Sequence, residues 1–319
     1  MVGVVILNYN NVKDTLNCVE SVLQFNTYPI KIVIVDNGST NPYVVPEIDS
    51  YLSHKYLDRY KRIDEGTPID TLNDITFFVS LHNDGYAQGN NKGLNLLYGD
   101  SDIKYILILN SDILFVEDII GWLVEDLQSV PNGAIVSPVL HKKDMNGIDY
   151  NCARRSASLT DLFIEYLFLF HDFGNLLSKR RKKRNLLIGR NLPLEEPLLE
   201  IELPSGSCML AGKEFFKSIG AFDSHTFLYN EEDILWVKIH RLGKKNYLDT
   251  RLRCIHLGAT TIDNKAPSEF VLNCSLESNY YYLKNYTNAG KLYLFCIKVF
   301  HYGIRLKWKI RQLLKKREN

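Results

Sequence analysis

The chain has 319 residues, of which 45% are hydrophobic and 24% charged, so it is not a disordered, collagenous or coiled-coil protein as a whole. Its 38 basic and 37 acidic residues nearly cancel, and the overall charge therefore gives no indication of nucleic acid as a partner. The basic charge is nevertheless concentrated at one end, because residues 291–319 hold nine lysines and arginines against one acid.

Strand and helix signals alternate over the first 140 residues. Buried strands are expected at 2–7, 31–35, 75–81, 105–109 and 134–138, and helices at 10–25 and 116–128. This alternation predicts an α/β fold with a mostly parallel sheet covered by helices. Ligands of such sheets bind at the carboxyl ends of the strands. Polar clusters fall at four of these ends, at 8–10, 36–39, 83–85 and 110–112.

The second half of the chain mixes short strands with helices. Residues 159–184 read as an insertion, in which an apolar, aromatic segment precedes the basic run KRRKKR. Strands are expected at 200–203 and 247–256, and helices at 212–219, 231–242, 268–288 and 291–316. We expect one mixed domain over residues 1–260, which includes the insertion, and a C-terminal helical region over 261–319.

The cysteine pattern and the N-terminus favour a cytoplasmic protein. None of the six cysteines forms a C-x-x-C pair, and their scatter fits buried, reduced thiols. The first apolar run, at 2–7, is too short for the core of a signal peptide. No stretch of 18 apolar residues occurs, so we expect no transmembrane helix.

Two aspartates follow buried strands. Asp36 follows KIVIV, where a carboxylate can accept hydrogen bonds from a nucleobase or a ribose, or can form an Asx turn or a helix cap. Asp112 ends the triplet NSD after YILIL. A carboxylate there can bind Mg²⁺ or Mn²⁺ together with substrate phosphates, or can cap the next helix.

Glycines recur every four residues in the segment NDGYAQGNNKG at 83–93, so on a helix they share one face. Such a face admits the close approach of a ligand or of another backbone, and close helix packing is the alternative reading. The segment is neither a dinucleotide fingerprint nor a P-loop.

Two further candidates lie late in the chain. Glu231, Glu232 and Asp233 open a predicted helix, where they can supply a general base at the mouth of a cleft or simply interact with the helix dipole. His256 follows a predicted strand, and a lone histidine of this kind is usually structural unless it lies beside Asp112.

Together these residues resemble the family 2 glycosyltransferases of the GT-A fold, in particular their bacterial rhamnosyltransferase-like branch. The matching motifs, in chain order, are VVILNYN at 4–10, VDNGS at 35–39, NDGYAQGNNKG at 83–93, NSD at 110–112, GSCML at 206–210, GAFD at 220–223 and FLY at 227–229. The resemblance covers residues 2–260, and the ordered set is much more specific than any one motif.

The resemblance implies a Rossmann-like GT-A domain with helices on both faces of the sheet. It also implies an inverting, metal-dependent transfer of a sugar from a nucleotide diphosphate sugar, such as dTDP-rhamnose or a UDP-sugar, to a saccharide or lipid-linked saccharide acceptor in bacterial surface polysaccharide synthesis. The residues that it assigns to the donor nucleotide are Asn8, Asn10, Asp36, Asn83, Gly85, Asn91, Asn110 and Ser111. Asp112 and His256 are assigned to Mn²⁺ or Mg²⁺.

The sequence departs from the family pattern at two places. Asn110 replaces the first acid of the D-x-D metal motif, which leaves Asp112 as the secure ligand of that motif. The usual E-D-x-D-L reads EEDIL at 231–235. A gapless alignment gives the catalytic base position to Glu232 and leaves the roles of Glu231 and Asp233 open.

Two other functions are alternatives to sugar transfer. A nucleotidyltransferase that makes nucleotide sugars would favour a Gly-rich, basic loop after the first strand, and the loop here is NYNN. A non-catalytic, membrane-associated scaffold would use the insertion and the C-terminus. Residues 292–314 predict a basic amphipathic helix, which favours peripheral contact with an anionic membrane, at the cytoplasmic face of the cell membrane. Packing on the catalytic domain or in a homodimer is the alternative.

Overall fold

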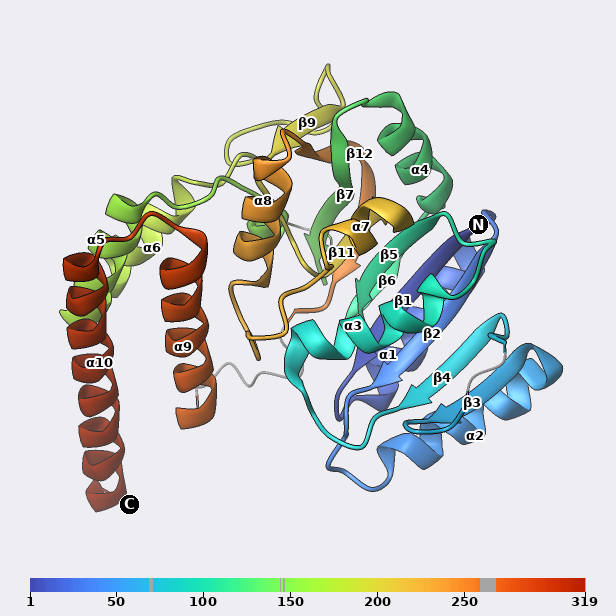
Figure 1. Cartoon of the computed structure of the whole chain (residues 1–319), viewed down its shortest axis with the longest axis horizontal. Coiled ribbons are helices and arrows are strands. Elements are labelled where there is room, and N and C mark those ends of the chain that lie inside the picture. The colour runs from blue at the N-terminus through green and yellow to red at the C-terminus, as the bar shows by residue number, and fades with distance from the viewer. Residues whose placement is uncertain (69–70, 144, 146, 259–267, 319) are drawn as a thin grey trace.

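The computed structural model describes residues 1–68, 71–143, 145, 147–258 and 268–318, and its centre is one large mixed sheet (Figure 1). The strand order is β3-β4-β2-β1-β5-β11-β7-β12-β6, and β9 pairs with β12. The strands are β1 (Val2–Asn8), β2 (Ile30–Asp36), β3 (Tyr60–Asp64), β4 (Ile75–Val79), β5 (Tyr105–Asn110), β6 (Ile113–Phe115), β7 (Gly133–Lys142), β9 (Leu198–Ile201), β11 (Cys208–Gly212) and β12 (Lys245–His256). Two short strands, β8 (Ala153–Arg154) and β10 (Leu203–Pro204), pair with each other.

Strands β3, β4, β2, β1 and β5 are parallel, which confirms the predicted parallel core of the sheet. Their carboxyl ends lie in register, with Asn8 opposite Asp36 and Leu7 opposite Asn110. Strand β11 runs antiparallel to both β5 and β7, whereas β7 and β12 are parallel. The predicted polar clusters at the ends of β1, β2 and β5 therefore meet at one edge.

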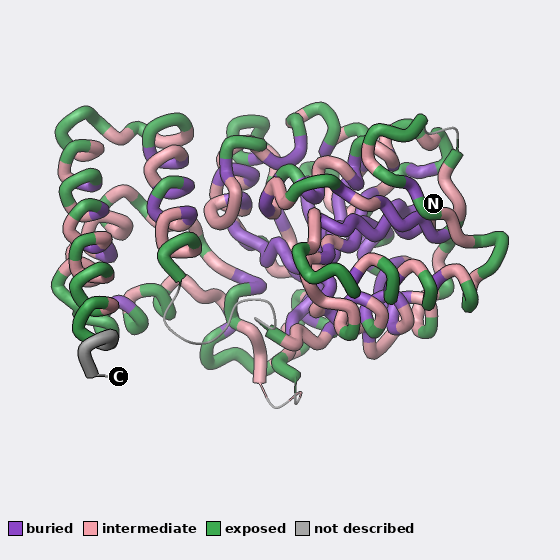
Figure 2. Tube along the Cα trace, turned by 90° about the horizontal axis from the view of Figure 1, so that it is seen from below, coloured by how far each residue is buried: buried purple, intermediate pink, exposed green. Residues whose placement is uncertain are grey.

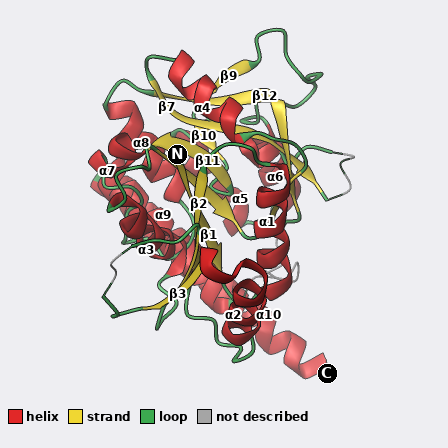
Figure 3. Ribbon diagram, turned by 90° about the vertical axis from the view of Figure 1, so that its right-hand side faces the viewer, coloured by secondary structure: helices red, strands yellow, loops and turns green. Residues whose placement is uncertain are grey.

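Helices cover both faces of the sheet, as Figure 3 shows for α1 and α3. The bounds are α1 (Val12–Phe25), α2 (Val44–Tyr56), α3 (Gly85–Tyr98), α4 (Ile120–Ser129), α7 (Lys213–Ser218) and α8 (Glu231–Arg241). Along β1, Val4 and Ile6 pack in one core with α1, α2 and α4, and Val5 packs in a second core with α3, α7 and α8. Burial on both faces explains the uninterrupted apolar run of this strand.

The insertion and the C-terminal helices form one helical layer beside the sheet (Figure 1). This layer consists of α5 (Leu159–Phe170), α6 (Gly174–Lys182), α9 (Glu269–Tyr286) and α10 (Lys291–Glu318). A third apolar core joins Tyr166 of α5, Ile234 of α8, Leu283 of α9 and Ile297 of α10. Thus the insertion packs against the C-terminal helices rather than standing alone. The predicted boundary at 260/261 lies outside the described residues.

Some helices and strands of the structure were not predicted, and one predicted helix begins later than expected. Helix α2 and strand β3 lie between the second and the third predicted strands, and the helix expected from residue 116 begins at Ile120. The chain just before α4 is extended because Ile113–Phe115 pairs with β12. Within the described residues, no helix combines the length and the apolar character needed to cross a membrane.

The glycine face of α3 packs on protein, which agrees with the close-packing reading of that motif. A Cβ atom on Gly89 would lie 2.7 Å from Leu7 Cδ1, and one on Gly93 would lie 2.6 Å from Val5 Cγ1. Gly85 has a φ of +80°, and a Cβ atom there would lie 2.1 Å from the carbonyl oxygen of Phe227. Gly85 therefore lets the start of α3 meet the loop before α8.

We expect Gly93→Ala to lower the free energy of unfolding by about 1–3 kcal/mol, because the added methyl overpacks the interface between α3 and the sheet. Urea denaturation measures the change. Gly99→Ala, at the end of the same helix, is the matched control, since the nearest atom to its Cβ would be 3.6 Å away. Equal stabilities of the two variants would contradict this packing.

Candidate active site

The loops after β1 and β2 are joined through Asp36, which is 1% exposed. Its Oδ1 accepts hydrogen bonds from Asn8 Nδ2 (2.7 Å) and from the Ser39 hydroxyl (2.5 Å), and its Oδ2 accepts one from the Ser39 backbone N–H (3.0 Å). The Thr15 hydroxyl donates to Asn8 Oδ1 (2.8 Å), which fixes the Asn8 amide. Asp36 therefore organises this edge of the sheet, as its Asx-turn reading anticipated.

Asn10 links the same two loops from outside. Its φ of +56° is one that asparagine tolerates better than most residues. Its backbone N–H donates to the Ser39 hydroxyl (2.8 Å), and its side chain donates to the Thr40 hydroxyl and accepts from the backbone N–H of Asn41. Asn8, Asn10 and Asp36 thus form a connected group beside the ends of β1 and β2. Their assignment to the donor stays a prediction.

The motif at 83–93 is tied to protein on both sides. Asn37 Nδ2 donates to Asn83 Oδ1 (3.0 Å) and to the carbonyl of Gly85 (2.9 Å). The Asn91 amide pairs with the backbone of Phe222, where it donates to the carbonyl and accepts from the N–H. These contacts give Asn83, Gly85 and Asn91 structural roles, and their assignment to the donor stays a prediction.

His256 lies between two carboxylates. Its Nε2 is 3.3 Å from Asp112 Oδ2, and its Nδ1 is 2.8 Å from Asp149 Oδ2. Antiparallel pairing of β12 with β6 sets His256 opposite Ile113, which brings it beside Asp112. His256 therefore lies beside Asp112, which is the arrangement that favours a functional rather than a purely structural histidine. Asp149 was not foreseen, because it lies in a loop after β7 with no motif around it.

The two carboxylates stabilise the charged form of His256. Burial alone would lower its pKa, but the hydrogen bonds to Asp112 and Asp149 raise that pKa to about 10. Conversely, the interaction with His256 holds the pKa of Asp149 below its usual value despite burial. These contacts favour an imidazolium at His256, between the carboxylates of Asp112 and Asp149.

The oxygen and nitrogen donors of this cluster fit a divalent metal ion. Asp112 offers a carboxylate oxygen and His256 offers Nε2, both of which Mn²⁺ accepts, while Asp149 holds the other ring nitrogen. Within the described residues, no group of three or more His, Cys, Asp or Glu side chains could by itself hold a metal ion. The donor set therefore suits an ion completed by substrate phosphates and water.

Asn110 and Ser111 precede this cluster. The Asn110 side chain donates to the Ser207 hydroxyl (3.2 Å), and its backbone N–H donates to the Ser207 carbonyl (2.9 Å), so that the ends of β5 and of the loop before β11 are joined. Ser111 is buried between Asn110 and Asp112.

Three acids open α8 after a strained turn. Tyr229 and Asn230 have φ values of +78° and +67°, which turn the chain sharply into the helix. Glu232 Oε1 accepts a hydrogen bond from the backbone N–H of Gly206 (3.0 Å), and the Tyr86 hydroxyl donates to the carbonyl of the same glycine (2.6 Å). Tyr86 of α3 and Glu232 of α8 therefore both bind the backbone of Gly206.

Glu231 is the most perturbed of the three acids. It is 6% exposed, and its Oε1 has no hydrogen-bond partner among the described residues. Burial, followed by repulsion from Glu232, raises the pKa of Glu231 to about 8. Burial also raises the pKa of Asp233, whose carboxylate accepts a hydrogen bond from the Asn230 side chain.

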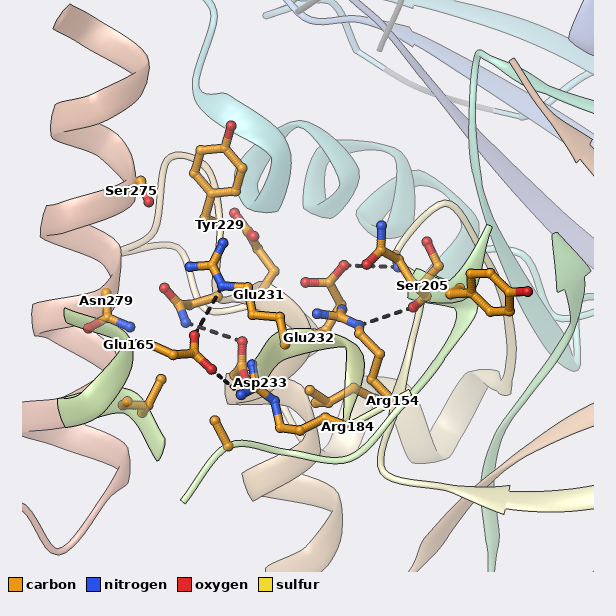
Figure 4. A pocket seen from close by; sticks show the side chains of 18 of the residues that line it. Arg154, Glu165, Arg184, Ser205, Tyr229, Glu231, Glu232, Asp233, Ser275 and Asn279 are labelled. Atoms are coloured by element: carbon orange, nitrogen blue, oxygen red, sulfur yellow. Dashed lines mark hydrogen bonds and ion pairs between the residues drawn. The ribbon is translucent and has the colours of Figure 1, made fainter. Parts of the chain in front are cut away.

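These acids line a cavity of about 900 Å³ between the sheet domain and the helical layer. Figure 4 shows Glu231, Glu232 and Asp233 between Ser275 and Asn279 of α9 on one side and Ser205 on the other. Of the predicted site residues, the cavity wall contains Asn110, Glu231, Glu232 and His256. Asp112 lies directly behind His256.

Strand β8 and the insertion add basic side chains to the cavity wall that sequence reasoning did not assign to the site. The wall includes Arg154, Arg181, Lys182 and Arg184. Arg181 and Arg184 both pair with the buried Glu165, so that two positive charges share one negative charge. In the sequence, the run KRRKKR at 179–184 was the one feature that could have indicated these basic residues. Its position at the cavity depends on the packing of α6.

Comparison with known proteins gives one family match. The family model described as Glycosyl transferase family 2 matches residues 3–187. The chain is 25% identical over 233 residues to the low-salt glycan biosynthesis hexosyltransferase Agl10 of Haloferax volcanii. This alignment covers 72% of this chain and 58% of that protein. The chain is 25% identical over 150 residues to the glycosyltransferase GlyG of Streptococcus pneumoniae, which covers 47% of this chain and 42% of that protein. The chain thus spans about half the length of these relatives.

A solved structure shares the fold. The crystal structure of GalNAc-T7 with UDP, GalNAc and Mn²⁺ superposes with a TM-score of 0.57 at 14% identity, over 95% of this chain and 54% of that one. With the mixed sheet and its two layers of helices, this confirms the predicted GT-A fold.

We expect the stability of the protein to fall as the pH rises between about 4.5 and 8. The folded chain keeps the Glu231 proton over this range and the unfolded chain loses it, at a slope of at most about 1.4 kcal/mol per pH unit. Glu231→Gln removes this contribution and flattens the profile, whereas Glu47→Gln, an exposed acid on α2, leaves it unchanged. Urea denaturation across this range provides the comparison, and equal slopes for the wild type and Glu231→Gln would refute the assignment.

Proposed function

The chain belongs to glycosyl transferase family 2, and from this we propose that it transfers a sugar from a nucleotide diphosphate sugar to a hydroxyl group of a saccharide acceptor, with inversion. One observation carries the proposal: His256, which contacts Asp112, and Glu232 line the same cavity. A cation site and a carboxylate base in one cavity are what such a transfer requires.

The donor occupies the carboxyl ends of β1, β2 and β5. Asp36 Oδ2 accepts only one of the hydrogen bonds described above and can accept another from a ribose hydroxyl or a nucleobase. Asn8 and Asn10 hold the loops around it. UDP-sugars and dTDP-rhamnose are the proposed donors, and UDP is the nucleotide that accompanies GalNAc-T7. Because the glycines at 83–93 pack on protein, that motif shapes the pocket wall rather than selecting the sugar.

Asp112 and His256 would hold Mn²⁺ or Mg²⁺, and Asp149 orients the imidazole of His256 through Nδ1. A bound ion would neutralise the negative charge that develops on the departing nucleoside diphosphate. Asn110, with its amide fixed by Ser207, stands beside this site.

Glu232 takes the proton from the acceptor hydroxyl. Its Oε1 is fixed by the N–H of Gly206, so the carboxylate faces the cavity from the start of α8. A base on the face opposite the leaving nucleotide gives inversion without a covalent intermediate. Glu231, the preceding residue, is buried, and because its pKa is raised to about 8 its carboxyl group keeps its proton at neutral pH.

The acceptor enters the part of the cavity formed by the insertion and α9. Serine and asparagine side chains there can bind sugar hydroxyls, and the arginines can bind the phosphates of a lipid-linked saccharide. We therefore assign donor binding to the sheet domain and acceptor binding to its border with the helical layer. Glycan biosynthesis is the setting that agrees with the name of the Haloferax relative.

We expect Asp112→Asn to abolish Mn²⁺ binding and sugar transfer, because the variant removes the anionic ligand. Asp149→Asn should weaken Mn²⁺ binding by roughly 10–100-fold, since it removes the charge that orients His256. Titration followed by Mn²⁺ electron paramagnetic resonance, with and without a nucleoside diphosphate, measures both effects. Asp58→Asn, an exposed aspartate, is the control.

Unchanged Mn²⁺ affinity in a folded Asp112→Asn protein would exclude this metal site. A change in melting temperature alone for Asp149→Asn, without a change in Mn²⁺ affinity, would reduce Asp149 to a purely structural residue.

We expect Glu232→Gln to lower kcat by about 10²–10⁴-fold, because the amide cannot accept the proton. Donor binding should remain close to that of the wild type, since this residue acts on the acceptor. Glu231→Gln and Asp233→Asn are the matched comparisons in the same turn of α8. A larger loss of kcat in either of them would move the base to that position.

A further inference from the structure

Helix α10 carries an apolar face that no described part of the chain covers. Seven apolar residues, spaced three or four apart, are 47–77% exposed: Leu292, Phe295, Val299, Tyr302, Leu306, Ile310 and Leu313. The opposite face of the helix is buried against the rest of the helical layer through Ile297, His301 and Ile304. We call the seven exposed residues the α10 stripe. Figure 2 shows exposed positions along the outer side of this helix.

The stripe is bordered by positive charge. Between residues 291 and 314 the sequence has six basic residues and no acid. Lys291, Lys298 and Arg305 follow one another at seven-residue intervals, each directly before a stripe residue, so they run along one edge of the stripe. Neighbouring helices partner four of the six, in the pairs Arg305–Glu277, Lys307–Asp172, Arg311–Asp172 and Lys309–Glu269. Three acids thus face six basic residues, and the surface stays positive.

Further exposed apolar side chains lie beside this helix. Phe173 and Leu176, at the junction of α5 and α6, are 50% and 47% exposed, next to the Asp172 that pairs with α10. Phe270, which follows the Glu269 that pairs with Lys309, is also exposed. An exposed apolar surface of this extent marks an interaction site.

A second copy of α10 is a poor partner for the stripe. Two such helices packed along it would bring two rows of lysine and arginine together, with no acid on either helix between 291 and 314 to pair with them. An anionic lipid surface, in contrast, accepts both features, because the apolar side chains enter the acyl boundary and the basic side chains meet the headgroups.

We propose that the α10 stripe lies on the surface of an anionic lipid bilayer and holds the protein there as a peripheral membrane protein. The inner sides of α5 and α9 line the cavity, through Leu162, Tyr166, Leu276 and Asn279. The acceptor part of the cavity is therefore separated from the membrane by α5 and α9 and by α10, which packs on them. This second point rests on the proposed function, whereas lipid binding by the stripe does not.

Flotation of the full chain with phosphatidylcholine vesicles, with and without phosphatidylglycerol, tests the proposal. We expect binding to the anionic vesicles at low salt, a loss at high salt through screening, and little binding to the neutral vesicles. Phe295→Ser combined with Leu306→Ser should reduce the vesicle-bound fraction at least about tenfold, and Lys291→Gln combined with Lys298→Gln should reduce it at low salt by about tenfold or more.

The controls are Leu242→Ser, an equally exposed leucine at the end of α8, and Lys104→Gln, an exposed lysine before β5. Both should float like the wild type. A wild-type chain that ignores anionic vesicles, or a stripe variant that still floats, would overturn the proposal. A dimer that light scattering detects and that Phe295→Ser with Leu306→Ser dissociates would assign the stripe to a second copy instead. Mn²⁺ and nucleotide binding in solution do not involve the stripe, so a failure here is separable from a failure of the proposed function.

Discussion

The pairing of β6 with β12 is the constraint on which the site depends. It sets His256 opposite Ile113 and lets the carbonyl of Asp112 accept a hydrogen bond from the backbone N–H of Leu257 (2.9 Å). Asp112 and His256, which are 144 positions apart, thereby become neighbours. Because β12 also runs parallel to β7, the loop after β7 reaches the same point and brings Asp149 to the imidazole. A short edge strand thus brings together the three residues of the proposed cation site, Asp112, Asp149 and His256.

Gly206 is the second junction. Its N–H binds Glu232, its carbonyl binds the Tyr86 hydroxyl, and a Cβ atom there would lie 2.8 Å from that hydroxyl and 3.0 Å from Glu232 Oε1. The glycine motif of α3, the loop before β11 and the proposed base are therefore packed as one unit. A side chain at this position would displace the Tyr86 hydroxyl or the Glu232 carboxylate from these contacts. This contact therefore joins α3 to the start of α8, beside the proposed base.

Much of this was predictable from local pattern. Strands β1, β2 and β5 are continuous apolar runs because both of their faces are buried, and their polar ends mark the donor edge. Strand β6 was missed because three residues carry no periodicity, and its existence depends on a partner far away in sequence. The same holds for Asp149 and for the arginines of the insertion, which only tertiary packing brings to the cavity. The α10 helix was predictable in outline, but which of its faces is exposed was not.

The central claim is that one cavity contains both the cation site at His256 and the base on α8. A crystal structure of the protein with Mn²⁺ and a nucleoside diphosphate tests it most directly. We predict that Asp112 and His256 ligate the ion, that the diphosphate completes its coordination, and that Glu232 lies across the cavity on the open side of the terminal phosphate. A diphosphate bound away from the ends of β1, β2 and β5, or an ion held without Asp112, would contradict the claim.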